Sequence, residues 1–437
     1  MTAIGAVGLL SLVLLVKAFR SDGGFRGLSP SSMLLFAAVV LPSLTLIAGV
    51  YLAQKVVLTD QFFNRIVQYQ GLALQINQVA SPLLLGIALL LAMIQMQRGS
   101  RLNPAALVFG LLLAVSALAR WGNGGNLMDG GQLTLLVVVL AAAVMPSGND
   151  ALRGAALGVG LLLSLSAIAA LVQPSLAAPP CDNRKCGLLG TFYVGVADNQ
   201  NTFGLMMAFA IPVFYFGLSR YKIYFVTVAT VLAFASGART AAIAAGLAAT
   251  VIFLVHVGRK RGSKAGGIVA SLLTLGAVAA TVVVPFIQLT PGTFSDRAGL
   301  WALARQLVTK QWFLGYGPNE WRSLVDIGVI PRAAGYSTHN QAMETLFVAG
   351  ALGVGLMVVT IVLVLGRSGG QLLRIATIVL PVAVAAVTER PWSLGGVDWA
   401  SWSLVLFLCL GALSVRQEAG PANSGSLAAP ALKSPSR

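Results

Sequence analysis

Charged residues are scarce along the whole chain. Only 10% of its 437 residues are Asp, Glu, Lys or Arg, whereas 57% are hydrophobic. A soluble domain carries about 25% charged residues, so this deficit excludes an ordinary water-soluble globular fold. The apolar residues fall into repeated runs, each close to the ~20 residues that a helix needs to cross a bilayer. The sequence therefore predicts an all-α polytopic membrane protein.

Cysteines and carboxylates are also few. Three cysteines cannot form a disulfide framework. Cys181 and Cys186 lie close together in a polar loop and can pair if that loop faces an oxidising compartment. No second cysteine pair completes a zinc site, and no Asp-x-Asp motif supplies oxygen ligands for a hard cation. We expect no metal and no cofactor.

Thirteen apolar segments are candidate membrane spans, and two of them, 2–16 and 375–388, are weak enough to leave the number at 12 or 13. The first segment lacks the basic start and the cleavage site of a signal peptide, so we count it as a span. The thirteen segments are 2–16, 30–52, 79–96, 104–120, 132–146, 155–172, 202–218, 223–237, 241–257, 267–287, 346–366, 375–388 and 399–415.

Basic residues are concentrated in alternate loops. The short loops and the C-terminal tail hold 17 of the 29 Lys and Arg residues but only 3 of the 13 Asp and Glu residues. This asymmetry is typical of a cytoplasmic face, so the net charge of +16 does not indicate a nucleic-acid partner. The tail 418–437 is rich in Pro, Ser, Ala and Gly, and we expect it to be disordered inside the cell.

The long loops then lie on the outer face, and 288–345 is the longest of them. Loops beyond about 15 residues usually carry function or structure of their own. Leu300, Leu303 and Leu307 have helical spacing, and Asp296 suits a helix N-terminus. We predict a short amphipathic helix that lies on the outer membrane surface and ends before the "GYG" turn at 315–317. That turn lacks the strand–turn–helix arrangement and the lysine of a phosphate-binding loop.

The outer loop holds His339, one of two histidines in the chain. A near-neutral imidazole can accept a proton from a hydroxyl at physiological pH, although a loop histidine is often only a satisfied polar group. Glu344 either orients this ring or marks the start of the next span. The other histidine, His256, ends a span beside basic residues, and we expect no catalytic role for it.

Two arginines are candidates for binding an anion. Arg239 lies between two apolar runs, where a charge costs from about 2.5 kcal/mol upward at the bilayer centre. It either reaches the headgroups or binds a ligand such as a diphosphate, whose oxygens match the guanidinium fork. Arg297 opens the predicted amphipathic helix, and it either points at a phosphate or pairs with Asp296.

Four ordered segments resemble the O-antigen ligase and O-antigen polymerase superfamily. They place a glycine–aromatic–asparagine entry before one span, an S-R-T-like turn before another, an arginine just before a tryptophan, and H-N plus a carboxylate before a glycine-bearing span. The segments are "GTFYVGVADNQNTFGLMMAFAIP", "SGARTAAIAAG", "FSDRAGLWALARQLVTKQWFLGYGPNEW" and "THNQAMETLFVAGALG", and they lie within 190–366.

The resemblance implies a metal-independent, inverting glycosyltransferase of the membrane-embedded C type in the bacterial inner membrane. Its donor would be a glycan on undecaprenyl diphosphate at the periplasmic face, and its acceptor lipid A–core. By the motif match, Arg239 and Arg297 would bind the diphosphate and His339 would be the general base. Glu344, Asn340 and Arg322 would support the site. One transmembrane domain, 1–417, would then contain the catalytic loop 288–345.

Other functions fit the same pattern. An O-antigen polymerase or a protein O-oligosaccharyltransferase would use the same donor end, and the residues do not reveal the acceptor. From a different class, the chain could be a transporter of lipid-linked glycans. Transporters tend to place ionisable residues near the midplane of the membrane, whereas the polar residues here gather in outer loops. This placement favours an enzyme.

Overall fold

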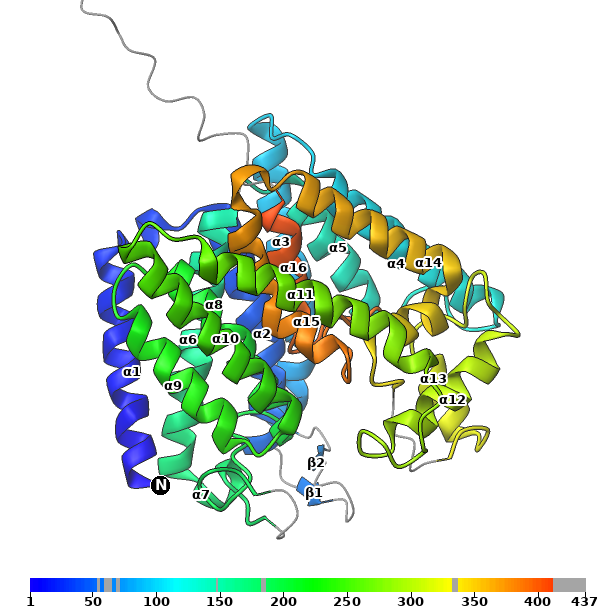
Figure 1. The fold of residues 1–437 in the computed structure, drawn as a ribbon, viewed down its shortest axis with the longest axis horizontal. Helices are drawn as coiled ribbons and strands as arrows, with labels where there is room; N and C mark the ends of the chain where they lie inside the picture. The colour runs from blue at the N-terminus through cyan, green and yellow to red at the C-terminus, as the bar shows by residue number, and fades with distance from the viewer. Residues whose placement is uncertain are drawn as a thin grey trace, which may run out of the picture.

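The fold is a bundle of apolar helices, with short helices and a two-stranded sheet in the connections between them (Figure 1). The computed structural model describes residues 1–52, 56–58, 65–67, 71–146, 148–181, 186–331 and 337–411. The predicted tail 418–437 lies outside these residues. The long helices are α1 (Thr2–Ser21), α2 (Pro30–Tyr51), α3 (Gly71–Gln97), α4 (Pro104–Gly122), α6 (Gly148–Val172), α10 (Arg239–Lys260), α11 (Ala265–Val283) and α14 (Gln341–Gly366).

Shorter elements complete the bundle. The apolar ones are α5 (Gly130–Val144), α8 (Gln200–Gly217), α9 (Lys222–Ala235), α15 (Leu372–Ala386) and α16 (Ser401–Leu410). The loops contain α7 (Pro174–Ala177), α12 (Arg297–Val308), α13 (Glu320–Asp326), and the antiparallel strands β1 (Val56–Leu58) and β2 (Arg65–Val67). Short 3-10 turns occupy Gly24–Gly27, Val284–Phe286 and Gly369–Gln371.

The predicted spans are confirmed as helices. Each of the thirteen apolar segments overlaps a helix in the described part of the chain, and the end of the last segment, 412–415, lies outside the described residues. Eight of the described helices are long and apolar enough to cross a membrane, and α5, α9, α15 and α16 are apolar but have only 10–17 residues. The protein is therefore an all-α polytopic membrane protein.

Helix α6 lies at the centre of the packing because its glycines let neighbours approach closely. A Cβ on Gly154 would lie 2.0 Å from the carbonyl oxygen of Ser32 in α2, and one on Gly160 would lie 2.8 Å from Leu15 in α1. Small residues serve this purpose in membrane helices, where packing replaces the hydrophobic effect. Most residues of α6 are buried, whereas the buried residues of α11 are only Gly266, Gly267, Ala270 and Thr281, so α11 is peripheral.

The connections gather into two groups. Arg153, after the α5–α6 connection, donates to the carbonyl of Gly27 at 2.6 Å, and Ser219 donates to Asp22 at 2.5 Å. Three loops with basic character therefore meet at one end. Elsewhere, Asn319 donates to Asp129 at 3.1 Å, which joins two of the long loops. Each of these contacts joins loops that the alternation of basic charge predicts to lie on the same side.

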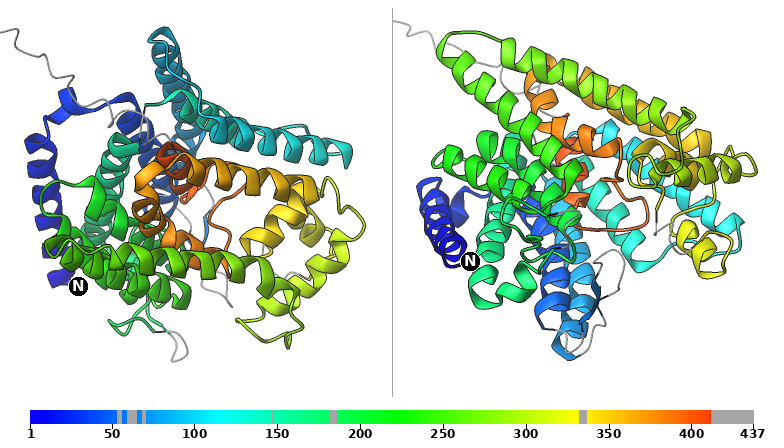
Figure 2. Two further views of the ribbon diagram at one scale, coloured as in Figure 1. Left: turned by 45° about the horizontal axis from the view of Figure 1, so that its top comes forward. Right: turned by 60° about the horizontal axis from the view of Figure 1, so that its bottom comes forward.

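Helix α12 forms where the spacing of leucines predicts it, but its apolar side has a different partner. Leu300, Leu303 and Leu307 are partly buried against the protein core, and Trp301 is fully buried. These leucines therefore pack against the protein, contrary to the expectation that the apolar face of this helix rests on the membrane surface. Figures 1 and 2 show α12 and α13 together at the side of the molecule away from α1.

Candidate functional site

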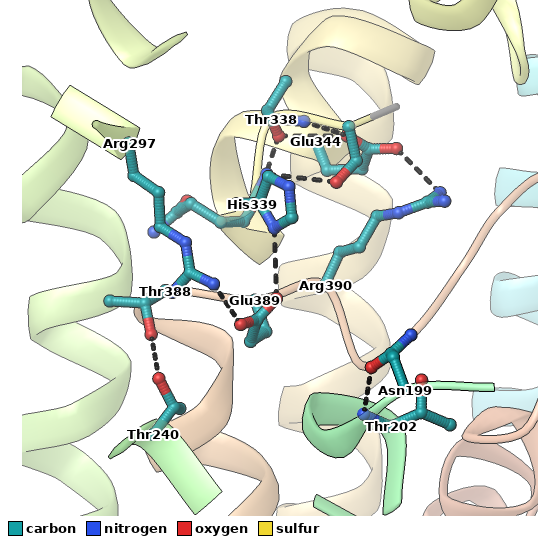
Figure 3. A network of polar contacts seen from close by, with 12 residues as sticks. Asn199, Thr202, Thr240, Arg297, Thr338, His339, Glu344, Thr388, Glu389 and Arg390 are labelled. Atoms are coloured by element: carbon teal, nitrogen blue, oxygen red, sulfur yellow. Dashed lines mark hydrogen bonds and ion pairs between the residues drawn. The ribbon is translucent and has the colours of Figure 1, made fainter. Parts of the chain in front are cut away.

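A carboxylate at the end of α15 joins two predicted functional residues. Glu389 Oε2 lies 3.1 Å from His339 Nδ1, and Glu389 Oε1 accepts a hydrogen bond from Arg297. Figure 3 shows the three side chains converging from separate elements. Glu389 and Arg297 are nearly buried, whereas 31% of the His339 side chain is exposed. Glu389 therefore holds the ring through Nδ1, while part of the ring stays exposed.

The charge state of Glu389 follows from two opposing effects. Burial raises the pKa of its carboxyl, but the hydrogen bond and charge of His339 and the charge of Arg297 lower that pKa by more. The net pKa lies below its ordinary range, so Glu389 is a carboxylate at neutral pH. A carboxylate bonded to Nδ1 selects the tautomer with a proton there, which leaves Nε2 as the acceptor.

The backbone around His339 is fixed by its neighbours. His339 has a φ of +51°, which L-residues seldom adopt outside turns. Asn340 caps α14 by accepting from the Met343 N–H at 2.9 Å, and its amide donates to the carbonyls of Thr281 and Val387. Asn340 thus ties α11, α14 and the end of α15 together directly beside the histidine.

Glu344 supports the same turn without touching the ring. Its Oε2 accepts from the Thr338 hydroxyl at 2.9 Å and from the Thr338 N–H at 3.2 Å, and its Oε1 accepts from Arg390 at 3.1 Å. Trp301 of α12 donates to the Thr338 carbonyl at 2.9 Å. Glu344 lies in the first turn of α14, and its contacts hold the segment before His339, which is a role beyond the two considered from the sequence.

Arg239 begins α10 and has an exposed side chain. It makes no ion pair with any described residue. Thr240, the next residue, contacts Thr388 at 3.0 Å, one residue before Glu389. The first turn of α10 is therefore anchored beside the His339–Glu389–Arg297 cluster, as Figure 3 shows for Thr240 and Thr388.

The remaining predicted residues lie elsewhere. Arg322 is exposed on α13 and lies 4.0 Å from Asp326 on the same helix. Cys181 and Cys186 form a disulfide in the loop before α8. His256 lies 3.3 Å from the Tyr215 hydroxyl near the far end of α10. In the part of the chain that the structure describes, no three His, Cys, Asp or Glu side chains gather as metal ligands would.

Comparison with known families agrees with the resemblance seen in the motifs. Residues 223–358 match the O-antigen ligase family. The match confirms the predicted resemblance to this superfamily. No curated protein matches the chain. Since members of the O-antigen ligase family are glycosyltransferase-like ligases and polymerases, the match supports an enzyme in general.

The matched segment contains only part of the cluster. Arg239, Arg297 and His339 lie inside 223–358, whereas Glu389 and Arg390 follow it. Glu389 and Arg390 are not among the residues predicted to form the site. The signal was available, because "TER" puts two adjacent charges between apolar segments. Their partners in the fold could not be read from that pattern.

Proposed function

We propose that the protein transfers a glycan from undecaprenyl diphosphate to lipid A–core at the periplasmic face of the bacterial inner membrane. The observation that carries the proposal is the contact of His339 and Arg297 with one carboxylate, Glu389. This arrangement supplies a base and a cation within one site. The O-antigen ligase match over 223–358 supports the same class of reaction.

The reaction is a direct displacement at the anomeric carbon. His339 Nε2 takes the proton from the acceptor hydroxyl while that oxygen attacks the carbon from the side opposite the diphosphate. The bond between the carbon and the phosphate oxygen breaks, and undecaprenyl diphosphate leaves with the electron pair. Glu389 holds the ring and stabilises the imidazolium that forms, a role that buried carboxylates play in other His-dependent enzymes.

Arginines would stabilise the leaving group. Arg239 is exposed and begins a membrane helix, and Arg297 lies beside the base. Guanidinium groups match phosphate oxygens bidentately and can neutralise charge as it develops on a leaving diphosphate. Transfer is therefore expected to continue in the presence of EDTA.

A transfer assay tests the proposal. Purified protein is given an undecaprenyl-diphosphate-linked glycan and one of two acceptors, lipid A–core or a second lipid-linked repeat. We expect transfer to lipid A–core and a fall of about 10²- to 10⁴-fold in His339→Ala, because the proton acceptor is lost. His256→Ala, at the other histidine, serves as the matched control and should retain activity.

The outcomes separate the alternatives. Wild-type rates in His339→Ala would contradict the assignment of the base. Extension of the lipid-linked repeat alone would identify a polymerase, which uses the same donor end. Absence of transfer to either acceptor, with passage of the lipid-linked glycan across proteoliposomes, would favour the transporter alternative.

A further inference from the structure

Two adjacent aromatic rings in the last turn of α8 each contact a cation from another helix. Tyr215 and Phe216 lie edge to face, with their ring centroids 5.0 Å apart. Lys222 of α9 places its Nζ 4.9 Å from the centroid of the Tyr215 ring, and Arg374 of α15 places its Cζ 5.1 Å from that of the Phe216 ring. Both distances lie within the ~6 Å over which a ring face attracts a cation. The two rings therefore hold two positive charges close together.

A third cation adds to this charge. Arg259, at the end of α10, is close enough to Arg374 for its charge to repel that of the guanidinium. No ion pair among the described residues includes Lys222, Arg259 or Arg374. Asp22 contacts this end of the bundle by accepting from Ser219, but it pairs with none of the three cations. The cluster therefore carries positive charge that the described carboxylates do not balance.

The guanidinium of Arg374 is partly removed from water. Its Nε is buried and has no hydrogen-bond partner in the part of the chain that the structure describes. A Cβ on Gly267 would lie 2.7 Å from the Cβ of Leu373, so α11 packs tightly against the start of α15 beside this arginine. Buried charges in proteins are usually paired. An anion on the open side of the guanidinium would supply the missing counter-charge.

Exposed apolar side chains flank the cations. Ile223 follows Lys222 in α9 and is 46% exposed, and Leu372 lies two residues before Arg374 in α15 and is 43% exposed. In a helix bundle that spans a membrane, exposed residues of this kind contact acyl chains. A ligand that joins an anion to hydrocarbon chains would match both parts of this surface.

This surface is separate from the His339 cluster. Arg374 lies near the start of α15, whereas Glu389 follows the end of that helix. Their separation along the helix is about 20 Å at the usual rise per residue. The loops at this end are the ones rich in basic residues, so the sequence predicts that it faces the cytoplasmic leaflet.

We propose that the ends of α8, α9, α10 and α15 bind the phosphate of an anionic phospholipid, with Arg374 and Lys222 at its oxygens and Ile223 and Leu372 beside its acyl chains. Arginine binds phosphate through its planar fork and lysine as a point charge. Basic pockets between membrane helices recognise anionic headgroups in this way. The site makes no use of the proposed transfer reaction.

A lipid titration tests the site. Phosphatidylglycerol is added to the full-length protein in a neutral detergent, and the saturable rise in melting temperature gives an apparent Kd. Arg374→Gln should weaken phosphatidylglycerol binding about tenfold, because a charge-assisted contact to the phosphate is lost. Arg261→Gln is the matched control, since it removes the same charge from an exposed position at the same end, and its Kd should stay within about twofold of the wild type.

Two further variants probe the second cation and the aromatic support. Lys222→Gln should weaken phosphatidylglycerol binding about fivefold, because it removes a charge without disturbing Arg374. Phe216→Leu should weaken it about threefold, because the guanidinium loses its ring contact while every charge remains. Melting temperatures before lipid is added show whether each variant is folded. If Arg374→Gln does not fold, Lys222→Gln carries the test against Arg261→Gln.

The choice of ligands separates a lipid from other sources of phosphate. Phosphatidylcholine has the same phosphate and chains but carries a choline cation, so it should raise the melting temperature little. Glycerol 3-phosphate lacks the chains and should not displace phosphatidylglycerol at equal concentration.

Three results would overturn the proposal. Equal phosphatidylglycerol affinities in Arg261→Gln and in the tested cluster variant would show that only the overall charge matters. An equal rise in melting temperature with phosphatidylcholine would show that the headgroup charge is not read. Displacement by glycerol 3-phosphate would identify a site for a soluble phosphate ester.

Discussion

Glu389 links side chains that are distant in the sequence. Arg297 opens α12, His339 precedes α14 and Glu389 follows α15, so the cluster exists only when three elements are assembled. The arginine and the histidine were predictable because polar residues are conspicuous in a chain with so little charge. The role of Glu389 was not predictable, because the sequence around it does not indicate which cationic side chains it will contact.

The lowered pKa of Glu389 leads to a pH-dependent stability. The folded pKa lies below the ordinary glutamate value of about 4.3, so folding favours the carboxylate. That contribution is present above pH ~4.3 and is lost as the pH falls through the folded pKa. Glu389→Gln should therefore lower the melting temperature most above pH ~5, and the difference from the wild type should shrink below pH ~4.

Thermal unfolding of both proteins in detergent across this pH range provides the measurement. Asp326→Asn is the control, because Asp326 is an exposed carboxylate on α13. A constant difference in melting temperature between Glu389→Gln and the wild type at every pH would show that deprotonation of Glu389 does not stabilise the folded state.

At the scale of elements, α14 is broken where the long loop 288–345 docks. Gly350 has φ +62°, and the N–H groups of Tyr316 and Gly317 donate to the carbonyls of Phe347 and Val348. Ala351 and Leu352 donate back to Trp312 and Phe313. Backbone groups freed by a break in a membrane helix need such partners. The "GYG" turn thus has a structural role, since it helps to satisfy the break.

Gly350→Ala should destabilise the protein. Positive φ disfavours a Cβ, and at this position it would lie 2.1 Å from the carbonyl oxygen of Phe313. We expect a loss of more than about 2 kcal/mol, seen as a lower melting temperature and reduced yield. Gly355→Ala, in the same helix with open space around it, should be neutral or slightly stabilising. Equal melting temperatures for the two variants would refute this explanation of the break.

The sequence of α14 did not reveal this break. Gly350, Gly353 and Gly355 occur close together, and each is compatible with a continuous helix or with a kink. The choice depends on the segment 312–317, which is distant in sequence and packs against only one of them. By contrast, the existence of the helix followed directly from the length of its apolar run.

For the whole molecule, hydropathy and charge predicted most of the architecture. Thirteen apolar runs became thirteen helices because each run must bury its backbone polar groups in a membrane. The antiparallel packing of α1 on α6 brings Gly5 against Leu171, close to the C-terminal end of α6. The N-terminus therefore lies at the same end of the bundle as the C-terminal end of α6.

Labelling of introduced cysteines tests which end faces outward. Lys310 is exposed in the long loop and Arg261 is exposed in a basic one, while Cys409 is buried and the other two cysteines are bonded. Lys310→Cys should react with a membrane-impermeant maleimide on intact spheroplasts, whereas Arg261→Cys should react only after permeabilisation. This result is expected because basic loops are retained in the cytoplasm. The reverse pattern would put His339 on the cytoplasmic side and exclude transfer to a periplasmic acceptor.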